Sequence, residues 1–138
     1  MSHEKSIFIA GASSEADEVA TVIELVCAAG WEVTADWPAM QKLESPNMSD
    51  EAKRALVLKL ENAIQAASFF WYMLPRTKSE GAAYEFGRFR GIKDRDPHGF
   101  TVVSGDHSAL GRLYTYASGK TVSFAEHLEA LNFLCRMQ

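Results

Sequence analysis

The chain has 138 residues, a formal net charge of −4 at pH 7 and a hydrophobic content of 47%. This length fits one domain with its own core, and an acidic chain with scattered basic residues argues against nucleic acid as a partner. The N-terminal apolar run is too short for a signal peptide, and no run reaches the length of a membrane helix. We therefore expect a cytoplasmic protein that does not act at a membrane.

Strand and helix patterns alternate along the first half of the chain. Short apolar runs bounded by turn residues predict strands, and apolar residues at helical spacing behind a capping residue predict helices. We expect a strand, a helix, a strand, a loop and a helix over residues 6–11, 13–29, 31–37, 38–48 and 49–67. Ser13 or Ser14 is the expected N-cap of the first helix and Ser49 of the second. The predicted apolar face of the second helix is Ala52, Leu56, Leu60, Ala63, Ile64 and Ala67.

The second half continues the alternation. A strand, a helix, a turn, a strand, a short strand and a closing helix are predicted over residues 68–74, 80–93, 95–99, 100–105, 121–124 and 125–137, and residues 106–119 carry no clear pattern. Strands that are apolar throughout and alternate with helices are typical of a parallel sheet covered on both faces. We predict a single domain over residues 1–138 with an α/β fold. It is expected to be a three-layer α/β/α sandwich of the flavodoxin or Rossmann type, with a mostly parallel sheet of four to five strands.

Metal-binding side chains do not cluster in the sequence. Cys27 and Cys135 are far apart and form no CxxC or Cys/His spacing, so we expect no metal site and no cofactor. Both fall in predicted helices, where we expect buried thiols in a reducing compartment. His127 falls among polar residues of the closing helix and is expected to be solvated. No Ser/His/Asp arrangement can be built around His107.

The candidate site follows from the predicted fold. In parallel α/β sheets, ligands bind outside the carboxyl ends of the strands. The loops that follow the predicted strands are residues 11–14, 36–38, 75–81 and 104–108. The first lies within GASSE, a small polar stretch whose backbone amides suit an anion or a sugar hydroxyl. It has neither a P-loop nor a GxGxxG pattern, and an ordinary capped turn explains it equally well.

The third loop leads into SEGAAYEFGR, residues 79–88, which contains one distinctive carboxylate. Ser79 is placed as an N-cap, and Gly81 would let a ligand approach the first helical turn. Glu85 lies four residues after Gly81, hence on the same side of the helix and one turn further along. The side chain is therefore expected to point toward the strand-end crevice. The alternative is a surface ion pair with Arg88, three residues on.

The same segment resembles the signature of the nucleoside 2-deoxyribosyltransferase superfamily. It is most similar to the 2'-deoxynucleoside 5'-phosphate N-hydrolases, whose motif Ser-x-Gly-x-x-Tyr-Glu-x-Gly-Arg is matched at every fixed position by residues 79–88. The resemblance extends over roughly residues 6–134. It implies an N-glycosidase that hydrolyses the base–sugar bond of a nucleoside 5'-monophosphate, a small-molecule substrate.

The resemblance also implies roles for single residues. Glu85 would be the nucleophile that forms a glycosyl-enzyme. Ser79 would hold the 5'-phosphate, because a serine and helix amides favour a phosphate where the aspartate of the deoxyribosyltransferases would repel it. Gly11 and its neighbours, Ser13 among them, would line the sugar together with Gly81. Ser108 would reach the phosphate from the neighbouring subunit, which implies a homodimer.

Two positions depart from the pattern of the family. Phe8 stands where the first strand usually has a tyrosine, and Leu60 stands where an aspartate helps to position the sugar. Glu61 is one residue further on and could replace that aspartate only if the helix is locally shifted. Other interpretations therefore stay open: a nucleotide-binding module without catalysis, a nucleoside deoxyribosyltransferase, or a TIR-like NAD hydrolase that also uses a glutamate.

Overall fold

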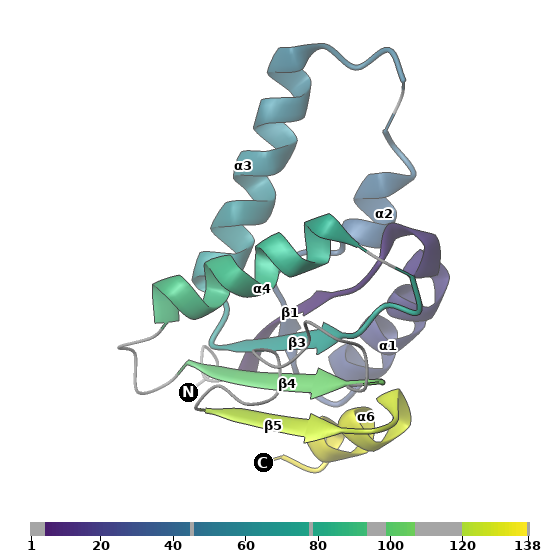
Figure 1. Cartoon of the computed structure of the whole chain (residues 1–138), viewed down its shortest axis with the longest axis vertical. Helices are drawn as coiled ribbons and strands as arrows, with labels where there is room; N and C mark the ends of the chain where they lie inside the picture. The colour runs from purple at the N-terminus through teal and green to yellow at the C-terminus, as the bar shows by residue number, and fades with distance from the viewer. Residues whose placement is uncertain (1–4, 45, 78, 94–98, 107–119, 138) are drawn as a thin grey trace.

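The computed structural model describes residues 5–44, 46–77, 79–93, 99–106 and 120–137, which contain a five-stranded parallel sheet (Figure 1). Its strands are β1 (Ser6–Ala10), β2 (Glu32–Val33), β3 (Phe69–Met73), β4 (Phe100–Ser104) and β5 (Thr121–Phe124). Their order is β2-β1-β3-β4-β5, and every neighbouring pair is parallel. This order is that of flavodoxin-like folds, and it confirms the predicted α/β class.

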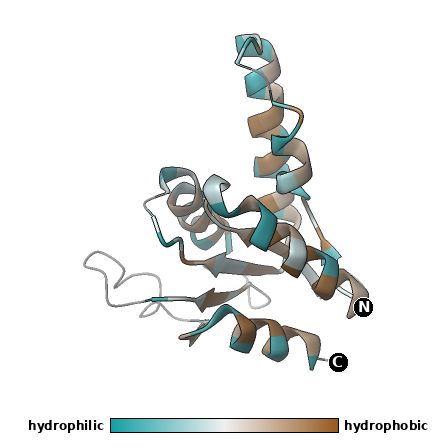
Figure 2. Ribbon diagram, turned by 90° about the vertical axis from the view of Figure 1, so that its right-hand side faces the viewer, coloured by the Kyte–Doolittle hydropathy of each residue, from teal (hydrophilic) through white to brown (hydrophobic). Residues whose placement is uncertain are grey.

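Helices cover both faces of the sheet. The helical elements are the 3₁₀ turn η2 (Ser13–Glu15), α1 (Ala16–Ala28), α2 (Trp37–Gln41), α3 (Asp50–Ala66), α4 (Glu80–Lys93) and α6 (His127–Cys135). Helices α1 and α6 pack on one face, and α3 and α4 pack on the other (Figure 1). In Figure 2 the helices carry both hydrophilic and hydrophobic residues, as expected for the outer layers of a three-layer sandwich.

Successive strand residues face opposite sides of the sheet and build two cores. Ile7, Ile9 and Trp71 pack beneath α1 and α6. Phe8 and Phe70 pack beneath α3 and α4, with their rings stacked and the centroids 5.6 Å apart. Because both faces are buried, the strands read as continuous apolar runs in the sequence.

The region after β2 differs from the prediction. The strand expected over residues 31–37 is only two residues long. Helix α2 begins at Trp37, the last residue of that expected strand, and continues into the stretch expected to be a loop. The carboxylate of Asp36 accepts a hydrogen bond from the backbone N–H of Ala39 at 3.2 Å, and Pro38 occupies the first turn. This N-cap and the preset backbone of proline begin a helix that periodicity alone could not reveal.

The expectation of two buried thiols is wrong. Cys27 and Cys135 are free cysteines, and both are exposed. Each follows a fully buried residue, Val26 in α1 and Leu134 in α6. One residue along a helix turns the side chain by about 100°, which carries each thiol off the buried face.

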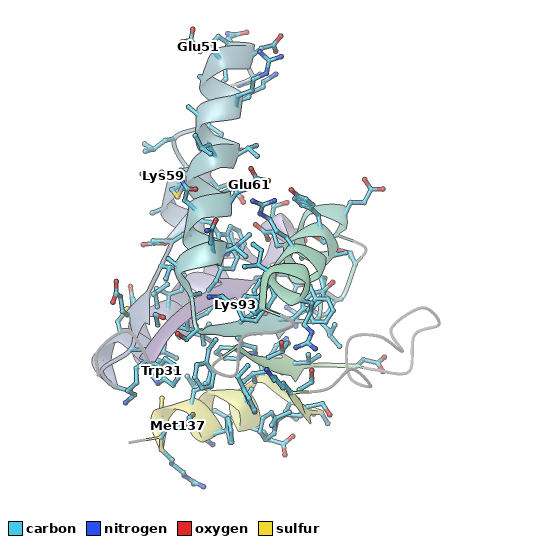
Figure 3. The ribbon with its side chains drawn as sticks, turned by 90° about the vertical axis from the view of Figure 1, so that its left-hand side faces the viewer. Trp31, Glu51, Lys59, Glu61, Lys93 and Met137 are labelled. Carbon is cyan, nitrogen blue, oxygen red and sulfur yellow. The ribbon has the colours of Figure 1, made fainter. Side chains whose placement is uncertain are left out.

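Helix α3 packs on the body only near its C-terminal end. Its buried side chains are Ala63 and Ile64, and the N-terminal half projects beyond the sheet, with Glu51 near the far end (Figure 3). The expected apolar face is correct in its last part, whereas Ala52 is exposed. Val57 and Leu58 are 51% and 58% exposed on the projecting half. None of the helices in the described ranges combines the length and the apolar character needed to cross a bilayer.

Candidate active site

A cavity of about 510 Å³ lies at the carboxyl ends of β1 and β3. These strands are neighbours in the sheet, and the helices that follow them, α1 and α4, pass to opposite faces. Such a divergence opens a crevice at the strand ends, which is where ligands bind in open α/β sheets. Three of the four loops expected at the site reach this cavity, through residues 11–14, Trp37 and residues 79–81.

Glu85 lines this cavity from the second turn of α4 and is half-buried. Burial raises the pKa of its carboxyl from 4.5 to about 7, because a low-dielectric environment disfavours the charged form. Arg88, the alternative ion-pair partner, lies 3.3 Å from a carboxylate oxygen of Glu61 instead. A carboxylate that is buried toward a cavity and has a perturbed pKa is typical of a functional site.

Ser79 and Gly81 begin the helix that carries Glu85. The hydroxyl of Ser79 accepts a hydrogen bond from the backbone N–H of Ala82 at 3.3 Å, which is the predicted N-cap. Both residues line the cavity. A Cβ added at Gly81 would have no heavy atom of the described chain within 4 Å, so packing within the chain does not require a glycine there. Its small size does keep the first turn of α4 open to the cavity.

The loop after β1 supplies the opposite rim. A Cβ at Gly11 would lie 2.9 Å from Val19 Cγ2, so a glycine is needed where this loop crosses α1. Ser13 and Ser14 are exposed and line the cavity. The expectation that one of them caps the first helix is wrong: the cap positions belong to Ala12 and Glu15, neither of which makes a capping side-chain bond.

Helix α2, which the sequence did not predict as a helix, forms one wall of the cavity. The indole N–H of Trp37 donates to the carbonyl of Ile9 at 2.7 Å. The side-chain amide of Gln41 donates to the carbonyl of Ser13 at 3.2 Å. These bonds hold α2 over the end of β1. The apolar residues that line the cavity from α2 and α3 are Trp37, Met40, Leu56 and Leu60.

Three further candidate residues lie outside the cavity or outside the described chain. Phe8 is fully buried in the core beneath α3 and α4. Glu61 lies on the side of α3 that faces α4 (Figure 3), where it accepts a hydrogen bond from the Tyr84 hydroxyl at 2.6 Å. Leu60, its neighbour, lines the cavity instead. Ser108 lies outside the described residues.

The charges around the cavity are acidic. Glu44, Glu80 and Glu85 are among its lining residues, and the described lining includes no lysine, arginine or histidine. Within the part of the chain that the structure describes, no three His, Cys, Asp or Glu side chains are grouped so that they could hold a metal ion. The described lining offers carboxylates, hydroxyls and an apolar wall.

A second cavity, of about 460 Å³, lies at the ends of β3 and β4 and beside the start of α6. His127 lines it and is half-buried, so the expectation that this residue is solvated is wrong. Its Nδ1 lies 2.6 Å from Oγ of the buried Ser104, which also accepts a hydrogen bond from the Trp71 indole at 2.8 Å. This chain of contacts anchors α6 to the sheet.

Comparisons with known proteins identify no relative: no family model, no curated protein and no solved structure matches the chain.

Proposed function

We propose that this protein is an N-glycosidase that hydrolyses the base–sugar bond of a nucleoside 5'-monophosphate, with Glu85 as the nucleophile. The observation that carries the proposal is the position of Glu85, half-buried in a cavity at the carboxyl ends of β1 and β3. The motif over residues 79–88, which resembles that of the 2'-deoxynucleoside 5'-phosphate N-hydrolases, assigns the same residue.

The chemistry requires only groups that this cavity holds, together with water. A carboxylate oxygen of Glu85 bonds to the anomeric carbon while the carbon–nitrogen bond to the base breaks. The bonding electrons go to the base nitrogen, which takes a proton from solvent water and leaves hydroxide. A water molecule then attacks the anomeric carbon of the glycosyl ester, its oxygen bonds to that carbon, and its proton goes to the hydroxide. The ester carbon–oxygen bond breaks and its electrons return to the Glu85 carboxylate, which frees the sugar. The apolar side chains of Trp37, Met40 and Leu56 suit the planar face of a base, and the hydroxyls of Ser13 and Ser79 suit the sugar and phosphate.

A second candidate substrate is a nucleoside without a phosphate. Ser79 and the positive end of the helix dipole at the start of α4 favour an anion. Glu44, Glu80 and Glu85 line the same cavity and would repel the double charge of a phosphate monoester. The acidic lining thus favours an uncharged nucleoside, the substrate class implied by the deoxyribosyltransferase alternative.

A homodimer in the cytoplasm belongs to the same proposal. The exposed Val57 and Leu58 on the projecting half of α3 support it, because a second copy could cover them. The free thiols Cys27 and Cys135 are in keeping with a reducing compartment. Sedimentation at micromolar concentration tests the dimer, and a monomer both with and without nucleotide would contradict it.

The decisive experiment measures base release by chromatography. The panel contains ribo- and deoxyribonucleoside 5'-monophosphates, the free nucleosides and NAD. We expect release from one class by the wild type and none by Glu85→Gln. Glu80→Gln removes a carboxylate from the same rim, so it serves as the matched control and should retain activity. Release of nicotinamide from NAD would instead favour the TIR-like alternative. Binding of a monophosphate without any release would mean that this fold binds nucleotides and does not cleave them.

A further inference from the structure

The turn η2 is bonded to two other segments of the chain that frame the cavity. On one side, the carbonyl of Ser13 accepts the Gln41 side-chain amide from α2 at 3.2 Å. On the other side, Glu15 faces the segment that follows β3. Its Oε1 accepts a hydrogen bond from the backbone N–H of Arg76 at 2.8 Å, and its Oε2 lies 3.3 Å from Nη2 of the same arginine. Glu15 itself does not line the cavity.

The contacts between Arg76 and the start of α1 differ in strength. The Arg76 side chain is 71% exposed, and its second partner, Glu18, is 35% exposed at a distance of 2.7 Å. Exposed ion pairs of this kind contribute little because water screens them. The Glu15 side chain is only 13% exposed, and its carboxylate accepts a backbone N–H. Hydrogen bonds to a charged group are stronger than those between neutral groups. The backbone bond therefore holds the segment more firmly than the ion pairs do.

The turn η2 and the segment after β3, which Glu15 joins, carry the serine hydroxyls of the cavity. Ser13 and Ser14 precede Glu15 on one rim, and Ser79 follows Arg76 by three residues on the other. We propose that Glu15 is a positioning residue: it holds the segment after β3 against η2 and thereby sets the spacing between these two rims. An effect of Glu15 on base release rests on the proposed function. Its effect on how firmly the backbone of residue 76 is held does not.

Three variants of the full chain separate the backbone bond from the ion pairs. Glu15→Met keeps the length of the side chain but cannot accept the hydrogen bond, and Glu15→Gln keeps an acceptor without the charge. Arg76→Ala removes the ion pairs and keeps the backbone N–H. Glu18→Gln is the matched control, since it weakens only the exposed pair. If Glu15→Met does not fold, Glu15→Asp takes its place, because the shorter side chain withdraws the carboxylate from the amide.

The first measurement is hydrogen exchange of the backbone amide of residue 76 by NMR. We expect exchange at least about tenfold faster in Glu15→Met, a smaller increase in Glu15→Gln, and rates close to the wild type in Arg76→Ala and Glu18→Gln. Unchanged exchange in Glu15→Met would overturn the proposal. Equal acceleration in Arg76→Ala would also overturn it, because the ion pairs would then be the anchor.

The second measurement uses 2'-deoxyadenosine and its 5'-monophosphate as probes for base release. We expect Glu15→Met to raise KM about tenfold with kcat nearly unchanged, and Glu15→Gln to restore most of the loss. A fall in kcat at constant KM would contradict a positioning role. If the wild type cleaves neither probe, the same comparison is made on their dissociation constants. Faster exchange in Glu15→Met together with neither cleavage nor binding in the wild type would refute the proposed function and leave the anchoring by Glu15 standing.

Discussion

Two carboxylates on neighbouring helices have opposite surroundings. Glu61 of α3 lies between α3 and α4, where the Tyr84 hydroxyl donates to it at 2.6 Å and Arg88 lies 3.3 Å away. Glu85 of α4 faces the cavity, and burial raises its pKa to about 7. Glu61 is engaged by two donors, whereas Glu85 is held in a place that disfavours its charged form.

This difference separates a carboxylate that joins two helices from one that faces the cavity. Tyr84 and Glu85 are adjacent in α4, so their side chains leave the helix in directions about 100° apart. Tyr84 thereby reaches Glu61, and Glu85 reaches the cavity. The resemblance to the N-hydrolases offers Glu61 as the replacement for a missing aspartate only if α3 is locally shifted, whereas in the structure Glu61 joins two helices. Each prediction below tests whether the two carboxylates are as different as this contrast implies.

The largest expected difference is in activity. Glu85→Gln should lower kcat for base release by about a thousandfold or more, because it removes the nucleophile. Glu61→Gln keeps an acceptor for Tyr84 and should lower kcat less than about tenfold. Steady-state kinetics on the substrate found in the panel measures both. A loss in Glu61→Gln as large as that in Glu85→Gln would show that Glu61 serves the reaction.

The pH dependence of base release should also depend on Glu85. A nucleophile must be deprotonated, so with a pKa of about 7 for Glu85 the rate should rise about tenfold per pH unit below pH 7 and level off above it. Glu61→Gln should leave this profile unchanged, since its carboxylate is not the titrating group. A rate that falls as the pH rises through 7 would assign Glu85 the role of a general acid.

Stability should also vary with pH through Glu85. Because its pKa is raised on folding from 4.5 to about 7, the folded state holds the proton more tightly. The free energy of unfolding should therefore decrease as the pH rises from about 4.5 to about 7, and stay level above that. Glu85→Gln abolishes this decrease. Relative to the wild type, the variant should gain at most about 3 kcal/mol between pH 4.5 and pH 8.

Urea unfolding at the two pH values measures this gain. Glu61→Gln is the matched variant, and at pH 8 it should be less stable than the wild type by about 1 kcal/mol, the scale of a partly exposed ion pair. If the difference in unfolding free energy between Glu85→Gln and the wild type were the same at pH 4.5 and pH 8, the carboxyl of Glu85 would not be desolvated.

The position of Glu85 could be predicted from the sequence because it depends on local rules. Apolar runs gave the strands, and the strand ends gave the edge of the sheet at which ligands bind. The four-residue spacing from Gly81 placed Glu85 on the side of α4 that lines the cavity. Ser79 was correctly expected to cap the same helix. All of these inferences use neighbours within about one helical turn or one strand.

The rest of the site depends on contacts between residues that are distant in the sequence. Trp37 bonds to Ile9, and Glu15 bonds to Arg76 across 61 positions. Neither pairing leaves a periodic signal, so α2 was expected to be a loop and Glu15 was given no role. The exposure of Cys27 was missed for a different reason. It depends on which side of the helix faces the core, and a shift of one residue rotates a side chain by about 100°. A prediction of where the helix begins and ends does not determine this rotation.

The smallest expected effect is on the pKa of Tyr84, whose hydroxyl bonds to Glu61 and not to Glu85. The pKa of Tyr84 is raised above 10, first by its hydrogen bond to Glu61, whereas Arg88 acts in the opposite direction. Glu61→Gln removes the carboxylate and should lower this pKa toward 10. Spectrophotometric titration, with Tyr84→Phe to identify the signal, measures the change. Glu85→Gln, the matched variant, should leave the titration of Tyr84 unmoved, because Glu85 is not among the groups that shift it. If Glu85→Gln did move it, the two carboxylates would share one electrostatic environment, and the contrast between them would fail even if only Glu85 were needed for catalysis.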